Sequence, residues 1–249
     1  MNDAARQSVQ LNNSLAESHT ALAGALLTFC DWTRAESEFQ LANALNPSYP
    51  GLHRLYAAML AAQKRQREAL EEINQAVRLD PLSLPNNAEV VRTLYYARDY
   101  DRAIQQARKA LQLDPVYYRT HFWLGRVYAQ KRMFKEAVTE AEMVLNATPD
   151  SNLGLTEMAY SLAATGRSTE ARAILRRLLE RKKNAFVPAY NLAIINVALN
   201  QNDVALEYLQ QAYDERDWAL AVLATEPRLD PLRGEPRFQE LARRLALPN

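Results

Sequence analysis

Six alanines recur at a constant interval of 34 residues along this chain of 249, with no insertion between them. They are Ala35, Ala69, Ala103, Ala137, Ala171 and Ala205. Four prolines keep the same interval, at positions 47, 81, 115 and 149. Such a period predicts an array of one repeated supersecondary unit instead of one or two ordinary globular domains.

Each unit reads as two helices joined by a short polar turn. Apolar or small residues stand four and seven positions after each alanine, as Phe39 and Ala42 do after Ala35, and these offsets share one helix face. An earlier set, such as positions 22, 23 and 26, marks a first helix whose middle residue is small in five of six units. Val91 is the exception. Small residues let crossing helices approach closely, so the pattern predicts tightly packed hairpins.

This pattern resembles the tetratricopeptide repeat, a helical hairpin of the same length with large, small, Ala and Pro positions in this order. The resemblance implies an all-α fold, an α-solenoid in which antiparallel helix pairs form a right-handed superhelix. The six units are expected at 16–49, 50–83, 84–117, 118–151, 152–185 and 186–219. Lys183 and Asp217 replace the proline in the last two units, so longer or irregular connections are expected there.

Both ends depart from the repeat. The register projected backward makes residues 1–15 the second helix of a truncated unit, which leaves one apolar face uncovered. We expect a chain cut from a longer one, or one that starts inside an ancestral array, with self-association through the incomplete unit as a possible consequence. Residues 220–249 leave the register and are expected to form a capping segment with a final amphipathic helix.

The stretch 227–233, Pro-Arg-Leu-Asp-Pro-Leu-Arg, is similar to the tail that closes tetratricopeptide arrays in large bacterial signalling proteins. This resemblance implies a second hypothesis for function. The chain would be the regulatory or sensory portion of a bacterial transcription regulator, kinase or cyclase.

Composition and missing motifs argue against several functions. The 30 basic and 29 acidic residues give a net charge of +1, so nucleic acid is not an expected partner. No apolar run is long enough for a membrane span and no signal peptide precedes the array, which predicts a cytoplasmic protein without a membrane partner. Phosphate-loop and catalytic signatures are missing, so we predict a protein that is not an enzyme and needs no cofactor or metal.

Three groups of reactive or charged residues have a structural interpretation as well. His19, His53 and His121 occupy the same position in three units, where they would stack along the array and not converge on one ion. Cys30 is interpreted as a packing thiol in a turn. The basic run at 176–183 is interpreted as a solvated helix face, with an acidic lipid or nucleic acid as the alternative.

The resemblance also implies where a partner binds. First helices of this family line a concave surface, and transferring the register gives the candidate groove residues Arg54, Arg92, Tyr95, Tyr96, Arg119, Phe122, Trp123, Arg126, Glu157, Tyr160, Tyr190 and Asn191. Guanidiniums pair with carboxylates and aromatic rings supply rigid apolar area, so a protein or extended peptide with acidic and apolar groups is the expected ligand. The alternative is that the aromatic residues pack adjacent hairpins together. The family's carboxylate clamp for chaperone tails is not reproduced.

The first hypothesis is therefore a non-catalytic scaffold for protein-protein interaction. An enzyme would need a pocket with convergent titratable groups, and the sequence does not reveal one.

Overall fold

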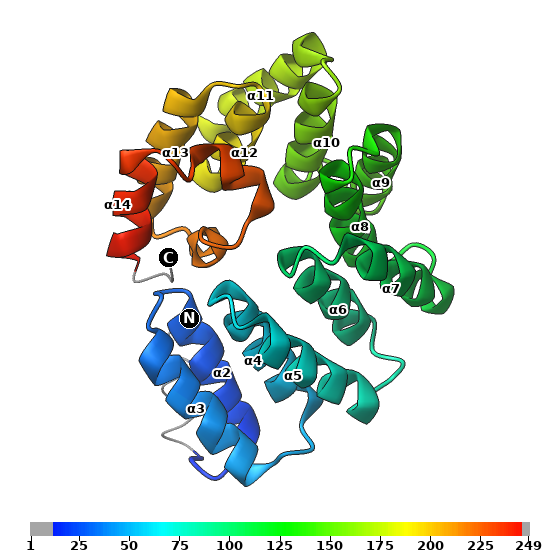
Figure 1. Ribbon diagram of the computed structural model, residues 1–249, viewed down its shortest axis with the longest axis vertical. Coiled ribbons are helices and arrows are strands. Elements are labelled where there is room, and N and C mark those ends of the chain that lie inside the picture. The colour runs from blue at the N-terminus through cyan, green and yellow to red at the C-terminus, as the bar shows by residue number, and fades with distance from the viewer. Residues whose placement is uncertain (1–11, 246–249) are drawn as a thin grey trace.

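The computed structural model describes residues 12–245, which form helices and short turns and contain no strand. Twelve α-helices form six successive pairs: α2 (Ala16–Leu27) with α3 (Trp32–Leu45), α4 (Pro50–Ala62) with α5 (Gln66–Leu79), α6 (Leu84–Tyr96) with α7 (Tyr100–Leu113), α8 (Tyr118–Gln130) with α9 (Phe134–Ala147), α10 (Asn152–Ala164) with α11 (Ser168–Lys182), and α12 (Ala189–Ala198) with α13 (Asn202–Asp214). The pairs stack side by side as an α-solenoid (Figure 1). The truncated unit predicted over residues 1–15 lies largely outside the described residues.

The solenoid curves until its two ends meet. The even-numbered helices contact one another in series and form the inner wall, while the odd-numbered ones lie outside them (Figure 1). The indole of Trp32 in α3 donates to the carbonyl of Leu245, 213 residues later, at 3.3 Å. The array is therefore a closed ring with an enclosed concave face.

The six alanines that recur every 34 residues lie where the two helices of a pair cross. All six are at most 1% exposed. In α8, a Cβ built on Gly125 would lie 3.1 Å from the Cβ of Glu140 and 3.6 Å from the carbonyl of Ala137. Backbones this close leave no room for a larger side chain, which explains why the sequence keeps small residues at both positions.

The turns inside the pairs repeat one left-handed conformation. The residues with positive φ are Cys30, Lys64, Arg98, Arg132, Gly166 and Asn200, again 34 apart. The next residue donates to a carbonyl five positions back, as Arg65 does to Leu60 at 2.9 Å, which is the hydrogen bond of a Schellman cap. The cap compensates for the steric cost of a left-handed non-glycine residue, so this array needs few glycines.

The three histidines join the helices of their pairs. In His19, His53 and His121 the Nδ1 atom lies 2.5–2.6 Å from the carboxylate of Glu38, Glu72 and Glu140 respectively. The Nε2 atom lies 2.8–2.9 Å from a backbone carbonyl in the preceding loop. Both neighbours of each ring can accept hydrogen bonds, and in His53 and His121 these bonds raise the pKa, which favours the imidazolium form.

The other pairs fill these positions differently. In the third pair Asn87 donates to the carbonyl of Pro81 at 2.9 Å, and its side-chain oxygen accepts from Gln106 at 3.1 Å. The fifth pair has Leu155 and Ile174 there, in an apolar cluster. The same backbone arrangement thus accommodates an ionic, an amide or an apolar contact.

The C-terminal segment, residues 217–245, turns back into the ring. It comprises two 3₁₀ helices, η1 (Trp218–Val222) and η2 (Pro227–Leu232), followed by α14 (Pro236–Arg244). Helix η2 packs on α12 and α13, and α14 packs on α13 (Figure 1). Among residues 12–245, no helix has both the length and the apolar character to cross a bilayer.

Candidate functional site

A cavity of about 430 Å³ occupies the centre of the ring. Its wall comes from α2, α4, α6, α8, α10 and α12, and helix η1 closes the circle. Nine of the twelve predicted groove residues line it, namely Arg54, Arg92, Tyr96, Arg119, Phe122, Trp123, Arg126, Tyr190 and Asn191. These side chains come from α4, α6, α8 and α12, which the stacking of first helices brings together.

The cavity has an exposed mouth and a buried floor. Trp218 is 68% exposed and Arg119 is also exposed, so both belong to the mouth. Tyr190 and Arg126 are 3% and 7% exposed and form the floor. All three tryptophans of the chain, Trp32, Trp123 and Trp218, line the cavity.

Aromatic rings separate the guanidiniums on the inner wall. Arg92 lies over the rings of Tyr96 and Trp123, 5.5 and 5.6 Å from their centroids. Arg126 lies 4.1 Å from the centroid of Phe122, which itself packs edge-on against Trp123. These cation-π contacts fix the planes of both guanidiniums in positions facing the cavity.

A buried ionic cluster supports the floor. The Nη2 atom of Arg126 lies 2.8 Å from Glu157, and Arg228 of η2 contacts both oxygens of that carboxylate at 3.0 Å. Arg228 also holds Glu226 through two 3.0 Å bonds, and the hydroxyl of Tyr95 donates to Glu226. Two carboxylates thus balance two guanidiniums away from water.

Charge complementarity decides the ionisation of this cluster. Burial by itself would raise the pKa of Glu226, but the charges of Arg228 and Arg126 and the hydrogen bonds lower it to about 2. Burial, together with the Glu226 charge, raises the pKa of Tyr95 well above its ordinary value. Glu226 is therefore a carboxylate and Tyr95 a neutral phenol at physiological pH.

The mouth carries guanidiniums without such partners. Arg92 pairs with Glu89 at 2.9 Å, but within residues 12–245 the side chains of Arg54 and Arg119 make no hydrogen bond or ion pair. Burial raises the pKa of Glu89, and the charges of Arg92, Arg54 and Arg119 offset part of this rise. Three guanidiniums thus act on one carboxylate, and the mouth has an excess of positive charge.

The floor carries one unsatisfied hydroxyl. The Oη atom of Tyr190 is buried and has no hydrogen-bond partner among the described residues. Burial is the main reason why the pKa of Tyr190 is well above its ordinary value, so this phenol stays neutral. A buried hydroxyl without a partner is costly, and a ligand group could satisfy it.

Three predicted groove residues do not line the cavity. Tyr95 and Glu157 belong to the ionic cluster, and the ring of Tyr160 lies 5.3 Å from the guanidinium of Arg228. The prediction of these residues as open groove positions is therefore wrong, because the C-terminal segment covers them. Sequence reasoning also missed Trp32 of α3 and three residues of the C-terminal segment, Trp218, Glu226 and Arg228. The one signal for the latter three was an indole and charged residues interspersed with apolar ones in the tail.

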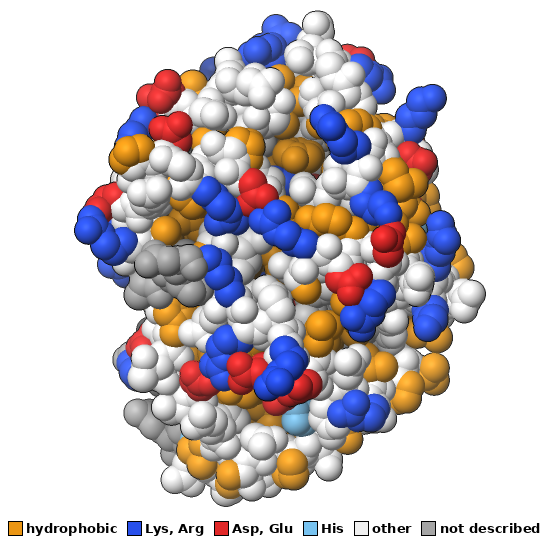
Figure 2. Space-filling view, viewed as in Figure 1, with side chains coloured by type: hydrophobic (Ala, Val, Ile, Leu, Met, Phe, Trp, Pro, Cys, Tyr) orange, Lys and Arg blue, Asp and Glu red, His pale blue; other side chains and the backbone are white. Residues whose placement is uncertain are grey.

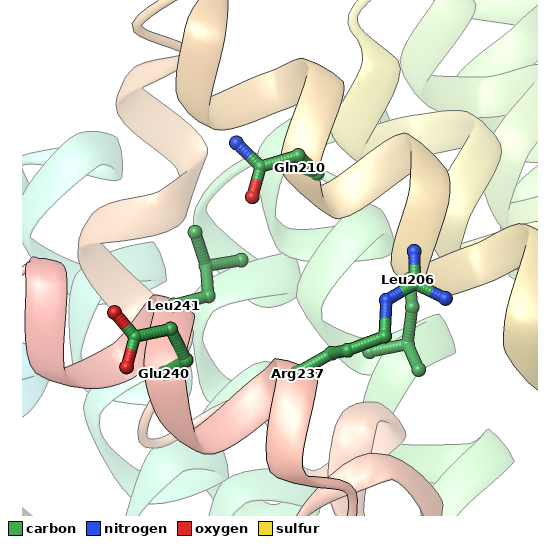
Figure 3. A pocket seen from close by; sticks show the side chains of 5 residues that line it. All are labelled: Leu206, Gln210, Arg237, Glu240 and Leu241. Carbon is green, nitrogen blue, oxygen red and sulfur yellow. The ribbon is translucent and has the colours of Figure 1, made fainter.

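The remaining candidate features do not form a second site. A cavity of about 150 Å³ between α13 and α14 is lined by Leu206, Gln210, Arg237, Glu240 and Leu241 (Figure 3). This volume is below the roughly 300 Å³ of small-molecule sites.

Among the described residues no cluster of His, Cys, Asp and Glu could hold a metal ion. Burial raises the pKa of Cys30 to about 11, which keeps its thiol protonated.

The basic run at 176–183 is largely neutralised. Arg177 pairs with Asp150, Lys182 lies 3.5 Å from Glu215, and Lys183 lies 2.7 Å from Glu180. Basic and acidic side chains are also interspersed over the face seen in the space-filling view (Figure 2). This arrangement favours the interpretation as a solvated helix face over that as a nucleic-acid or lipid site.

Solved structures of other proteins share this fold. A structure described as a functional characterization of Pseudomonas aeruginosa PilF is 21% identical, with a TM-score of 0.58, and the match covers 92% of this chain and 97% of that one. PilW, described as a widely conserved type IV pilus biogenesis factor, is 21% identical, with a TM-score of 0.62 and coverages of 84% and 97%. The human IFIT1 dimer with PPP-AAAA is 14% identical, with a TM-score of 0.68 and coverages of 98% and 67%.

At these identities the likeness concerns the fold alone. No curated protein matches the sequence significantly. The model of the tetratricopeptide repeat matches residues 91–152 and 156–221, together just over half of the chain. Because this family model matches more than half of the chain and residues 16–214 form helix pairs of this kind, the chain belongs to the tetratricopeptide repeat family.

Proposed function

We propose that this protein is a non-catalytic interaction scaffold that binds a short acidic and apolar segment of a partner protein in its central cavity. The observation that carries the proposal is the convergence of four arginines and five aromatic residues from α4, α6, α8 and α12 on one cavity. Arginine and aromatic side chains dominate the binding energy of protein interfaces.

The chemistry of the lining supports binding over catalysis. Glu89 is the one carboxylate that lines the cavity, and it is paired with Arg92. Arginines remain protonated at every physiological pH, and burial raises the pKa of both Tyr96 and Tyr190. Burial also raises the pKa of Glu89, but this carboxyl is held in its ion pair with Arg92, and among residues 12–245 no second acid or base lines the cavity beside it to complete a catalytic pair.

Ring closure limits the form of the ligand. An open groove would accept a long extended peptide, whereas this cavity is surrounded by six helices and η1 and holds about 430 Å³. That volume is within the range of small-molecule and side-chain pockets. The proposed ligand is therefore a short segment that enters from the mouth.

A blocking variant tests the proposal. Ala58 lines the cavity and is partly exposed, so Ala58→Phe should fill the cavity without overpacking a helix crossing. We expect the wild type to bind an acetylated Asp-Phe-Asp amide in isothermal titration calorimetry and the variant to lose at least about tenfold in affinity. The control Ala44→Phe, on the exposed face of α3, should bind as the wild type does. Equal binding by all three proteins would show that the ligand does not occupy the cavity.

The resemblance of the tail supports a more specific setting. We propose that the scaffold works in a bacterial cytoplasm as the regulatory portion of a signalling protein or transcription regulator. Affinity purification of the native protein from the source organism tests this, because the array should be recovered on the same polypeptide as a DNA-binding, kinase or cyclase domain. Recovery of pilus or envelope proteins instead would contradict this setting.

A further inference from the structure

We propose that the cavity recognises its ligand at two levels, with an acidic residue at the mouth and an uncharged apolar side chain that bears a hydrogen-bond acceptor at the floor. This inference rests on the proposed function and specifies its ligand. It assigns separate roles to Arg54 and Arg119 at the mouth and to Tyr190 at the floor.

The mouth selects negative charge because its cations are not neutralised. Glu89 pairs with Arg92, which leaves Arg54 and Arg119 without a hydrogen bond or ion pair among the described residues. Neither guanidinium is fully buried, so each can pair with an arriving carboxylate without a large desolvation cost. A planar guanidinium also binds a carboxylate through two parallel hydrogen bonds.

The floor selects against charge. Arg126 is 7% exposed and already bound to Glu157, while Glu226 and Arg228 complete a balanced cluster directly behind it. A second carboxylate brought there would lose its water and find no unpaired cation, which is strongly unfavourable.

Apolar area and one hydroxyl remain at the floor. Phe122 and Tyr96 are 7% and 5% exposed and present ring surface to the cavity. The hydroxyl of Tyr190 lacks a partner there and can donate to a ligand oxygen. A phenol, an amide or a backbone carbonyl on the inserted group would accept this bond, whereas a phenylalanine side chain would not.

Five peptides with blocked ends separate the two levels. Their sequences are Ser-Asp-Tyr-Asp-Ser, Ser-Ser-Tyr-Ser-Ser, Ser-Lys-Tyr-Lys-Ser, Ser-Asp-Phe-Asp-Ser and Ser-Asp-Asp-Asp-Ser. Each is titrated by calorimetry, with quenching or enhancement of the three cavity tryptophans as a second signal. We expect the acidic-flanked tyrosine peptide to bind about tenfold tighter than the serine-flanked one, and the lysine-flanked peptide to bind weakest.

Two variants assign the levels to residues. The double reversal Arg54→Glu and Arg119→Glu should invert the preference, so that the lysine-flanked peptide binds better than the acidic one. Arg108→Glu with Arg172→Glu changes the net charge equally on exposed outer-helix positions and should leave the preference intact. Tyr190→Phe should abolish a roughly threefold to tenfold advantage of the tyrosine-centred over the phenylalanine-centred peptide.

The outcomes distinguish the two proposals. If no peptide binds to the cavity, the proposed function itself is wrong. If peptides bind with equal affinity whatever their flanks, the scaffold stands and the assignment of Arg54 and Arg119 is wrong. If the aspartate-centred peptide binds as tightly as the tyrosine-centred one, the floor does accept charge and the assignment of Tyr190 is overturned.

Discussion

The helix pairs and the C-terminal segment are stabilised by different forces, although they enclose the same cavity. The pairs are joined by small and apolar residues that recur every 34 positions and are almost completely buried, such as Ala103 and Ala137. The C-terminal segment is held by a buried ionic cluster around Arg228 and by a bidentate pair between Arg98 and Asp230 at 2.7 and 2.8 Å.

The difference is one of contact range. Each helix pair depends on residues within one or two units, whereas Tyr95 and Glu226 are 131 positions apart in the sequence. Short-range apolar contacts make an array that can grow by repetition. Long-range polar contacts make a segment that fits at one place only, because each buried charge requires its own partner.

The largest effect is expected from breaking the ionic cluster. Arg228→Met leaves Glu157 and Glu226 facing a single guanidinium in a buried site, which should lower the free energy of unfolding by roughly 3 to 5 kcal/mol. Urea denaturation monitored by circular dichroism measures the loss. The double variant Arg228→Met with Glu226→Gln restores the balance of charge and should recover part of the stability. Unchanged stability of the single variant would show that the cluster does not hold the segment.

Overpacking a helix crossing should cost less. Ala103→Leu or Ala137→Leu places three extra carbon atoms where the side chain is at most 1% exposed, and the expected loss is about 1 to 3 kcal/mol. Ala44→Leu on the exposed face of α3 serves as the matched control, and thermal melts compare the three. A crossing variant that melts like the control would mean that the crossings lie elsewhere.

Much of the helix-pair region could be predicted from the sequence because packing there is periodic. The positions of Ala103 and Ala137 at crossings and of Arg92 and Trp123 on the inner wall all follow from one register. The C-terminal segment could not be placed in this way. Its charges have no period, and nothing in the sequence around Glu226 indicates that Tyr95 is its partner.

Because the C-terminal segment could not be placed from the sequence, three residues were predicted as open groove positions that it covers. Tyr95, Glu157 and Tyr160 have the register of groove positions, and an array without the tail would expose them. Their coverage depends on where Arg228 lies, which is a property of the closed ring. A cluster of charged residues outside the repeats, next to apolar residues such as Leu229, is the kind of signal that indicates a buried contact.

The histidine pairs give a pH-dependent contribution of smaller size. Burial lowers the pKa of His53 and His121, but the bonds to a glutamate and a backbone carbonyl outweigh burial and leave both pKa values raised. These pairs therefore stabilise the folded chain fully below about pH 6.5, the unfolded value, and the contribution is lost as the pH rises through the raised folded value. We expect about 1 kcal/mol per pair.

The third helix pair provides the control for this effect. His53→Asn with Glu72→Gln reproduces the Asn87 and Gln106 contact, which does not titrate. Unfolding in urea between pH 5 and 8.5 should show a shallower loss of stability in this variant than in the wild type. Identical pH profiles would mean that the second pair does not contain an imidazolium.

The smallest effect is expected at the surface clamp of the C-terminal segment. Arg98 and Asp230 are 50% and 37% exposed, so water screens their attraction. Asp230→Asn should lower stability by less than about 1 kcal/mol in denaturant melts, well below the effect of Arg228→Met. A comparable loss at both sites would place the main attachment of the segment at the surface.

Native-state hydrogen exchange tests most directly whether the C-terminal segment is a permanent wall of the cavity. The amides of Leu223 and Leu229 donate within the segment at 3.0 and 3.2 Å, and that of Leu199 donates at the end of α12 at 3.0 Å. We predict that the opening that exposes the amides of Leu223 and Leu229 to exchange has the same free energy as the opening that exposes the amide of Leu199. The reason is that the buried cluster unfolds only together with the array. Exchange of Leu223 and Leu229 through a separate, low-energy opening would contradict a closed ring.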